Sequence, residues 1–509
     1  MTRGIGLRRY SLCLSVATLI LSAFTPAKTV CSPEYRAVTI LHTNDTHGHL
    51  LPFSYRESLN NSEERVKIPV NDSIGGIARR ATLVHRIENE VGGEVLLLDA
   101  GDVMDGTAFS IEYMGEADFA AMSKAGYDAF TPGNHEFSTS LDQFWKNVKT
   151  ATFPILAANV IDKKSKKLVL PDHKIFDIHG VKIAIFGLTL PNEYRAAKEG
   201  LGFLDPYGVA TELAPRLKKQ ADVVIALTHL GLENDIRLAE KVPAIDVIVG
   251  GHSHSRLETP LVIKHPGMQS AFSLGGTIIV QDHRWGGELG RLDLKLRRNN
   301  GPFTLMSYRG RLIPVTSDIP EDSATARVVA RYYTPISAKY EQIVGEASDT
   351  FWNDNKLENS MLNLVCDAML EATRAEVAIY NEGGVRGDLA KGTIRYWDIA
   401  EAFPFKNKLV VIRVSGKELK RVLETERPGV SGARYRIRSG KLTYAMLDGE
   451  AVNESKTYLV ATVDFLADRI FQGVSDSRIV SDDYRQAIVS YIKTRKTITP
   501  VLDGRRVID

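Results

Sequence analysis

A short apolar run that ends in polar residues recurs five times in the first half of the chain. The runs are residues 38–41, 95–98, 128–130, 223–227 and 247–249, and an Asp, Asn or His follows each of them within a few positions. Such apolar, β-branched runs are typical of buried strands, and α/β sheets bind ligands at the carboxyl ends of their strands. We therefore expect five strands whose ends converge on one site.

Helical patterns lie between and after these runs. Residues 76–87 place apolar side chains at 77, 81, 84 and 87 on one helical face, which leaves His85 as a surface or packing residue. A polar, helix-like stretch at 322–341 is expected to link two halves of the chain. The second half then combines a helix around 359–372 with strand-like runs at 377–380 and 409–414.

Composition places the chain among globular proteins. Its 509 residues are too many for one ordinary domain and favour two large ones. With 44% hydrophobic and 25% charged residues the chain can bury a sizeable core, which excludes a disordered or fibrous protein. The 64 basic and 62 acidic residues nearly balance, which disfavours binding to nucleic acids or anionic membranes.

Residues 1–27 have the pattern of a signal peptide. The segment begins with three basic residues, Arg3, Arg8 and Arg9. An apolar stretch follows at 12–24, and Thr-Pro-Ala at 25–27 resembles the small-residue region before a cleavage site. The apolar stretch is too short to span a bilayer comfortably, so we expect an exported protein, periplasmic or extracellular, with no stable membrane anchor. The pair Arg8-Arg9 leaves general secretory and twin-arginine export both open.

Three cysteines exclude a disulfide framework. Cys13 lies in the expected signal peptide, and Cys31 and Cys366 are the two that remain after its removal. One bridge between them is possible, but the apolar neighbours of Cys366 favour simple core packing.

Histidines are confined to the first part of the chain, since all twelve stand at or before His283. This asymmetry indicates two parts with different chemistry, and the first part is the place to look for a metal. Six further histidines besides His85 are interpreted as packing or surface residues: His42, His49, His173, His179, His265 and His283.

Seven candidate metal ligands follow the five expected strands. They are two carboxylates, one amide and four imidazoles: Asp45, Asp102, Asn134, His47, His229, His252 and His254. Hard oxygen atoms mixed with imidazole nitrogens suit Mn²⁺, Zn²⁺, Fe or Co²⁺. One tetrahedral site needs three or four ligands, so seven favour two divalent ions about 3.5 to 4 Å apart that share one carboxylate. Such a pair lowers the pKa of a bridging water and clamps the oxygens of a phosphoryl displacement.

The order of these motifs along the chain is similar to that of a known protein family. The chain resembles the calcineurin-like metallophosphoesterases, and more closely the secreted 5′-nucleotidase family, which includes the periplasmic UDP-sugar hydrolases. The resemblance rests on residues 45–48, 101–102, 133–136, 228–229 and 251–254, and it extends to 381–386, 403–405 and 414–419. It implies an α/β protein with an N-terminal metallophosphoesterase β-sandwich flanked by helices (αββα) at 35–312, a linker helix region at 313–342, and a smaller mixed α/β substrate-binding domain at 343–509.

The resemblance also implies a role for each motif residue. By it, Asp45, His47 and His254 hold one metal, Asn134, His229 and His252 hold the other, and Asp102 bridges them. His135 would stabilise the developing phosphoryl charge or protonate the leaving oxygen. In the C-terminal domain it assigns phosphate binding to Arg386, a substrate contact to Asn381, and the stacking of a base to Phe405 and Phe465.

Three positions depart from the family pattern. Ser138 stands where the family usually has an aspartate that orients the catalytic histidine, and a hydroxyl cannot stabilise imidazolium as a carboxylate does, which leaves the operating pH and rate open. Asn355 stands where the family has an arginine, with Lys356 as the nearest cation, and residues 468–473 replace a glycine-rich loop. The substrate pocket is therefore expected to differ from the family standard.

Together these features predict an exported dinuclear-metal phosphoesterase that hydrolyses nucleoside 5′-monophosphates or related nucleotides by in-line attack of a metal-bound hydroxide. A thiosulfohydrolase or a 2′,3′-cyclic-nucleotide phosphodiesterase on the same scaffold stays an alternative, as does a non-catalytic exported nucleotide-binding protein. Retention of all seven ligand positions argues against an idle metal centre. Metal identity, the preferred nucleotide and the oligomeric state stay open.

Overall fold

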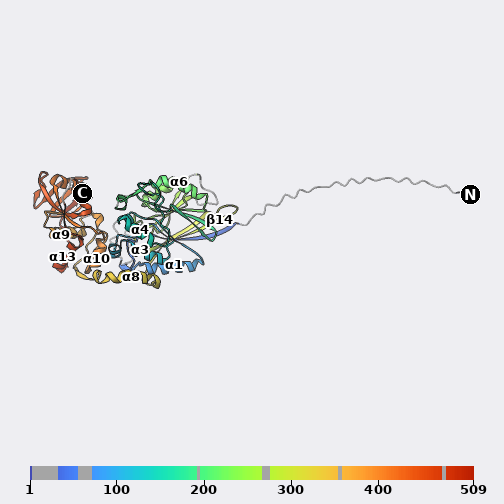
Figure 1. Cartoon of the computed structure of the whole chain (residues 1–509), viewed down its shortest axis with the longest axis horizontal. Coiled ribbons are helices and arrows are strands. Elements are labelled where there is room, and N and C mark those ends of the chain that lie inside the picture. The colour runs from blue at the N-terminus through green and yellow to red at the C-terminus, as the bar shows by residue number, and fades with distance from the viewer. Residues whose placement is uncertain are drawn as a thin grey trace.

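The computed structural model of the chain describes residues 1–2, 33–54, 72–191, 195–265, 267, 275–353, 358–472 and 477–509. Figure 1 shows two domains side by side, with helix α8 (Ser323–Tyr340) running along one edge of both. Nearly all of the expected signal peptide, together with Cys31, lies outside the described residues. Among the described residues, no helix has both the length and the apolar character needed to cross a membrane.

Two sheets form the centre of the N-terminal domain. The first has the strand order β15-β14-β1-β4-β5, and the second has the order β12-β13-β11-β10-β8-β7. In the first sheet the strands are β1 (Glu34–Thr43), β4 (Leu96–Asp99), β5 (Ala129–Phe130), β14 (Glu288–Arg298) and β15 (Thr304–Pro314). In the second they are β7 (His173–Ile178), β8 (Val181–Thr189), β10 (Val223–His229), β11 (Val247–Val249), β12 (Leu261–Lys264) and β13 (Gly276–Val280).

Alternate residues of each central strand face two different cores. Ile40 of β1 and Ile225 of β10 belong to the apolar layer between the sheets, whereas their neighbours Leu41 and Val224 face the helices outside. Because these strands are buried on both faces, they appear in the sequence as unbroken apolar runs. The helices complete four layers: α1 (Ile77–Val91), α3 (Glu116–Ala125) and α4 (Leu141–Thr150) beside the first sheet, with α6 (Pro206–Lys218) and α7 (Leu232–Lys241) on the second.

The five expected strands are therefore confirmed as β1, β4, β5, β10 and β11, and the αββα sandwich is confirmed as the fold. The first three lie parallel in one sheet, and the last two lie parallel in the other. The two expected helices at 76–87 and 322–341 are α1 and α8. Asp322 caps α8, because its side chain accepts a hydrogen bond from the Thr325 amide at 2.7 Å.

The C-terminal domain is a smaller mixed α/β unit. Its main sheet has the order β20-β17-β24-β19-β25, from β17 (Val377–Tyr380), β19 (Leu409–Ser415), β20 (Gly429–Ser431), β24 (Thr457–Val463) and β25 (Ser477–Ser481). One smaller sheet consists of β16 (Ile343–Ala347), β18 (Gly392–Arg395) and β26 (Thr497–Ile498). Another consists of β21 (Ala433–Arg438), β22 (Lys441–Leu447), β23 (Glu450–Ala451) and β27 (Arg506–Ile508). Its helices are α9 (Ser360–Thr373), α10 (Tyr396–Ala402), α11 (Gly416–Thr425), α12 (Asp464–Ile470) and α13 (Arg485–Arg495).

Helix α8 joins the two domains through apolar packing. One continuous cluster contains Ile87 of α1, Val329 and Tyr340 of α8, and Met361 of α9. Tyr340 also packs on Tyr396 of α10, with 5.1 Å between the ring centroids. Cys366 of α9 is a buried free thiol, as its apolar neighbours indicate. The limits 35–312, 313–342 and 343–509 stay a prediction.

Candidate active site

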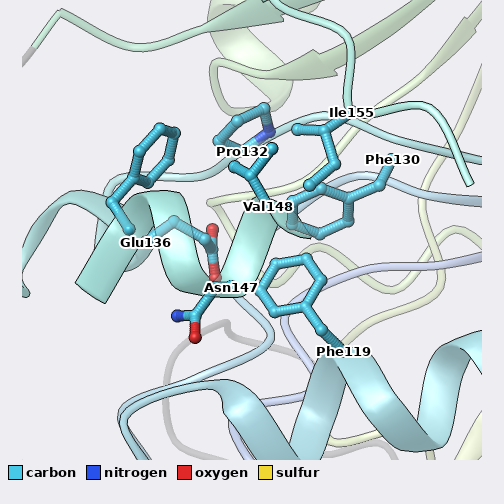
Figure 2. Close-up of a pocket in the computed structure, with 8 residues that line it drawn as sticks. Phe119, Phe130, Pro132, Glu136, Asn147, Val148 and Ile155 are labelled. Carbon is cyan, nitrogen blue, oxygen red and sulfur yellow. The ribbon is translucent and has the colours of Figure 1, made fainter. Parts of the chain in front are cut away.

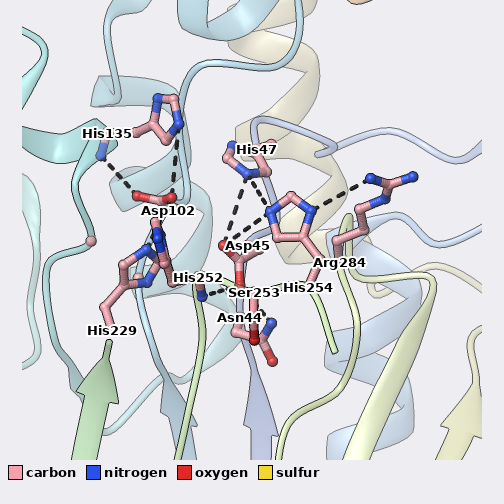
Figure 3. Close-up of polar contacts among 12 residues, drawn as sticks. Asn44, Asp45, His47, Asp102, His135, His229, His252, Ser253, His254 and Arg284 are labelled. Carbon is pink, nitrogen blue, oxygen red and sulfur yellow. Dashed lines mark hydrogen bonds and ion pairs between the residues drawn. The ribbon is translucent and has the colours of Figure 1, made fainter. Parts of the chain in front are cut away.

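The candidate ligands gather where strands of both sheets end. Figure 3 shows their side chains projecting from the ends of the strands into one region. Asp45 follows β1 and Asp102 follows β4 in the first sheet, whereas His229 ends β10 and His252 and His254 follow β11 in the second. The strand ends expected to converge therefore do so, and the ligands come from both sheets.

Five of the ligands have a left-handed backbone, which L-residues rarely adopt outside special turns. The φ angles are 50° for Asp45, 46° for His47, 57° for Asp102, 78° for His252 and 52° for His254. Neighbouring glycines make room for these turns, since a Cβ at Gly133 would lie 2.2 Å from Asp102 Oδ1. Such conformations persist where the surrounding structure enforces them, and they cluster at functional sites.

The first ligand group consists of Asp45, His47 and His254, whose ligand atoms all lie within 4.8 Å of one another. His47 Nδ1 donates to the Met104 carbonyl at 2.9 Å, so its Nε2 lone pair points into the group. His254 Nε2 lies 3.3 Å from Asp45 Oδ1. The other oxygen of Asp45 accepts from Asn44 at 2.7 Å and from the His252 amide at 2.9 Å, which fixes the carboxylate.

The second ligand group consists of Asp102, His229 and His252. His229 Nδ1 donates to the Ala100 carbonyl at 2.7 Å, and its Nε2 faces Asp102 Oδ2 at 3.0 Å. Burial lowers the pKa of His229, but the nearby Asp102 carboxylate outweighs this effect and raises the pKa to about 10. His229 Nε2 and Asp102 Oδ2 therefore hold either a proton or a cation between them.

The donor set of both groups fits divalent metal ions. Asp45 Oδ1 and His229 Nε2 are buried, and the atoms that face them, His254 Nε2 at 3.3 Å and Asp102 Oδ2 at 3.0 Å, form no well-aligned hydrogen bond with them. Buried polar atoms without a partner are costly, and a cation satisfies both. Carboxylate oxygens combined with neutral imidazoles favour Zn²⁺, Mn²⁺, Fe or Co²⁺ over a metal that prefers thiolates.

Two neighbours hold the Asp102 carboxylate in place. Its Oδ1 accepts from the His135 amide at 2.8 Å, and its Oδ2 faces His229. Asn134 is 5% exposed and directly precedes His135 in the loop after β5. This places Asn134 beside the second group, and its ligand role stays a prediction.

Glu136 is a structural residue of the site to which the sequence pattern assigned no role. Its two oxygens accept from the amides of Asp102 at 3.0 Å, Val103 at 2.9 Å and Gly133 at 2.6 Å, which ties the two ligand loops together. Figure 2 shows Glu136 at the edge of an apolar pocket whose lining includes Phe119, Phe130, Pro132, Val148 and Ile155. Burial, followed by the Asp102 charge, raises the pKa of Glu136 to about 7. Its position directly after Asn-His was the only signal available in the sequence.

His135 lies between the metal ligands and the C-terminal domain. Its ring is 5.1 Å from the His47 ring and 6.0 Å from the nearly parallel Phe405 ring, measured between centroids. The guanidinium of Arg386 lies 5.9 Å from the Phe405 centroid. Burial lowers the pKa of His135, but Asp102 and Asp105 outweigh it, so that the pKa lies above its ordinary value. Two of the four residues expected to bind substrate thus border the candidate metal centre.

The other two expected substrate residues have no described contact with the candidate ligands or with His135. Asn381 is partly exposed and directly precedes the short helix at 382–384. Phe465 of α12 is 39% exposed, with the Arg469 guanidinium 5.5 Å from its ring. No described ring contact joins Phe465 to Phe405, although the Lys408 amide donates to Asp464 at 3.0 Å and brings the two segments together.

The three departures from the family pattern have different outcomes. Ser138 stands where the family usually has an aspartate, but a carboxylate still contacts the histidine, because Asp105 Oδ2 lies 3.0 Å from His135 Nδ1. Asn355 and Lys356 lie outside the described residues, as does Gly473. Residues 468–470 belong to α12, and Phe471 after it is buried in the domain core, whereas Asp468, Arg469 and Gln472 are exposed.

Comparison with known proteins agrees with this geometry. Residues 38–256 match the family model of the calcineurin-like phosphoesterases, and residues 339–472 match that of the 5′-nucleotidase C-terminal domain. The fold and the site thus define a calcineurin-like metallophosphoesterase. The chain is 30% identical to a 5′-nucleotidase of Vibrio cholerae, over 92% of this chain and 91% of that protein. The chain therefore belongs to the 5′-nucleotidase family and is a metal-dependent phosphoester hydrolase.

Solved structures show the same architecture. The 5′-nucleotidase precursor from Thermus thermophilus superposes with a TM-score of 0.81 at 28% identity, over 93% of this chain and all of that one. The sulfate thiohydrolase SoxB of Thermus thermophilus superposes with a TM-score of 0.77 at 19% identity, over 92% of this chain and 96% of that one. At that identity, the likeness to SoxB shows the fold alone.

Metal removal should lower stability, because two buried carboxylates then lose their countercharge. We expect the melting temperature of chelator-treated protein to rise on addition of Mn²⁺, Co²⁺ or Zn²⁺. Each cation at one hundred times its Kd adds about 2.7 kcal/mol to the free energy of unfolding. Asp102→Asn should reduce this shift, whereas His85→Ala, on the exposed face of α1, should leave it intact. Melting curves that do not change across a metal titration would contradict the assigned ligand groups.

Proposed function

We propose that this protein hydrolyses nucleoside 5′-monophosphates or related nucleotides such as UDP-sugars. The single observation that carries the proposal is the position of Arg386 and Phe405 beside His135 at the edge of two metal-ligand groups. A guanidinium binds phosphate, and a flat ring stacks on a base. The site thus combines Arg386 for the phosphate and Phe405 for the base with two ligand groups suited to phosphoryl transfer.

We assign two divalent ions to the centre. Asp45, His47 and His254 would hold one ion, Asn134, His229 and His252 would hold the other, and Asp102 would serve as the ligand common to both. Bound there, the ions supply Lewis-acid activation of water and of the phosphoryl oxygens. The protein fixes the ligands beforehand, since Met104 and Ala100 orient two of the imidazoles through their Nδ1 atoms.

His135 acts on the reacting phosphoryl group or on the leaving oxygen. Its Nε2 is directed toward the ligand groups, 3.9 Å from Asp102 Oδ2. A protonated imidazole there stabilises negative charge as it develops or gives a proton to the departing ribose oxygen. Arg386 holds the phosphate, Phe405 and Phe465 enclose the base from opposite sides, and Asn381 contacts the substrate.

We propose that the protein is exported after removal of residues 1–27, because the charged start, the apolar stretch at 12–24 and the small-residue exit form a signal pattern. We also propose the division into a metal domain at 35–312, a linking region at 313–342 and a substrate domain at 343–509. In this division Arg386 and Phe405 belong to the substrate domain, and the seven ligands belong to the metal domain.

A substrate panel tests the proposed activity. Metal-depleted protein should be inactive and should regain activity with Mn²⁺, Co²⁺ or Zn²⁺, with AMP or UDP-glucose turned over faster than a 2′,3′-cyclic nucleotide or a thiosulfonate. Phosphate release is measured for AMP, nucleoside monophosphate formation for UDP-glucose and the cyclic nucleotide, and sulfate release for the thiosulfonate, all under the same conditions. Preference for either of the last two substrates would assign the alternative enzyme, and nucleotide binding without turnover would assign the binding protein.

His135→Gln should lower kcat strongly while leaving metal content unchanged, because the imidazole acts on the substrate and belongs to neither ligand group. General acid catalysis contributes about 10²- to 10⁴-fold, so a loss in this range is expected. Metal per chain is measured by inductively coupled plasma mass spectrometry. Simultaneous loss of metal would mean that His135 is itself a ligand.

Phe405→Ala should raise KM for AMP through the loss of one stacking surface, worth about 1 to 3 kcal/mol per base. The exposed ring of Phe465 should give a smaller effect in Phe465→Ala. The matched measurement uses ribose 5-phosphate, which has no base and whose KM should not depend on either ring. Equal KM changes for AMP and ribose 5-phosphate would contradict a stacking role.

A further inference from the structure

The environment of His135 Nδ1 departs from the pattern that the sequence resemblance implies. Asp105 Oδ2 lies 3.0 Å from this nitrogen, and the Ser138 hydroxyl donates to the same oxygen at 2.5 Å. A carboxylate accepts only, so His135 Nδ1 carries the hydrogen. One carboxylate oxygen therefore receives hydrogen bonds from both the imidazole and the hydroxyl.

This arrangement determines which ring atom of His135 faces the reaction. With Nδ1 directed at Asp105, Nε2 is the atom on the side of the two ligand groups. The ring also packs edge to face on His47, at 5.1 Å and 86° between planes. Both the position and the hydrogen-bonding pattern of the imidazole are thus set from the Asp105 side.

The backbone holds Asp105 firmly in this place. Its φ of 66° is left-handed, a conformation that Asp and Asn tolerate better than most residues. The next residue, Gly106, packs so closely that a Cβ there would lie 2.1 Å from the His47 carbonyl oxygen. Asp105 therefore stands on the same rigid loop as the ligand Asp102, three residues further along the chain.

We propose that Asp105 is the positioning residue for His135, and that Ser138 fixes the Asp105 carboxylate. The carboxylate that the family resemblance leads one to expect at position 138 is thus supplied from the loop after β4, and the short Ser138 side chain leaves room for it. Asp105 belongs to neither ligand group, so it acts through His135. The inference rests on the proposed hydrolytic function.

The first test is Asp105→Asn in the metal-loaded enzyme, which removes the charge but keeps a residue suited to the left-handed backbone. Loss of a residue that orients a functional side chain typically costs about 10- to 100-fold in activity, and we expect this loss in kcat for AMP. KM and metal content should stay close to the wild-type values, because Asp105 contacts His135 and no ligand. Ser138→Ala should give a smaller loss, since the carboxylate remains.

The decisive test restores a carboxylate beside His135 from position 138 in place of position 105. Ser138→Asp added to Asp105→Asn places an acid at position 138 beside the same histidine, and we expect kcat to recover at least tenfold relative to Asp105→Asn alone. A general packing role of Asp105 would not be rescued by this exchange. Asp172→Asn is the matched control, because Asp172 forms a similar contact with His173 Nδ1 at 2.8 Å on the surface.

The outcomes separate this inference from the proposed function. Wild-type protein without activity on any phosphoester would overturn the proposed function. Wild-type activity that Asp105→Asn leaves intact, or an exchange variant no better than Asp105→Asn, would overturn the positioning role. Loss of metal from Asp105→Asn would also overturn it, because Asp105 would then act on the metal centre and not on His135.

Discussion

Two buried carboxylates, Asp45 and Asp102, impose the constraint on which the rest of the site depends. Burial of an ionised carboxylate is costly unless an opposite charge or several donors compensate it. Amide donors satisfy one oxygen of each, and the remaining oxygens face imidazole nitrogens at 3.3 Å and 3.0 Å. Cations in these positions relieve that cost. The left-handed turns, the close glycines and the orienting carbonyls all serve to maintain this arrangement.

The sequence predicted the scaffold well because its strongest signal is a recurring pattern, an apolar run followed by polar residues. Strands covered on both faces must be apolar along their whole length, and the ligands directly after them meet wherever strand ends meet. The distribution of these strands over two sheets was not readable in the same way. Each run looks alike whether its neighbour lies in the same sheet or across the core, so only the resemblance to a family indicated a sandwich.

Residues that support the ligands were harder to find. Glu136 stands in a single turn of 3-10 helix and Asp105 in a loop, where no periodicity marks a functional position, and their importance depends on which amide or imidazole lies opposite. The effect of Ser138 stayed open in the sequence because its spatial partner, Asp105, could not be read from that single position. The sequence favoured Phe405 over Phe465 as a stacking residue, and in the structure Phe405 packs on His135 whereas Phe465 is 39% exposed.

Each ligand group takes residues from both sheets, which links the chemistry to the interior of the sandwich. The two sheets that carry the ligand loops pack on each other through the layer containing Ile40, Ile225 and Val249. Close-packed interiors transmit small volume changes to their edges. Substitutions deep in this layer, remote from any substrate, are thus expected to alter the spacing of the two ligand groups. Natural variants adapted to different temperatures have a route to altered turnover that leaves every active-site side chain in place.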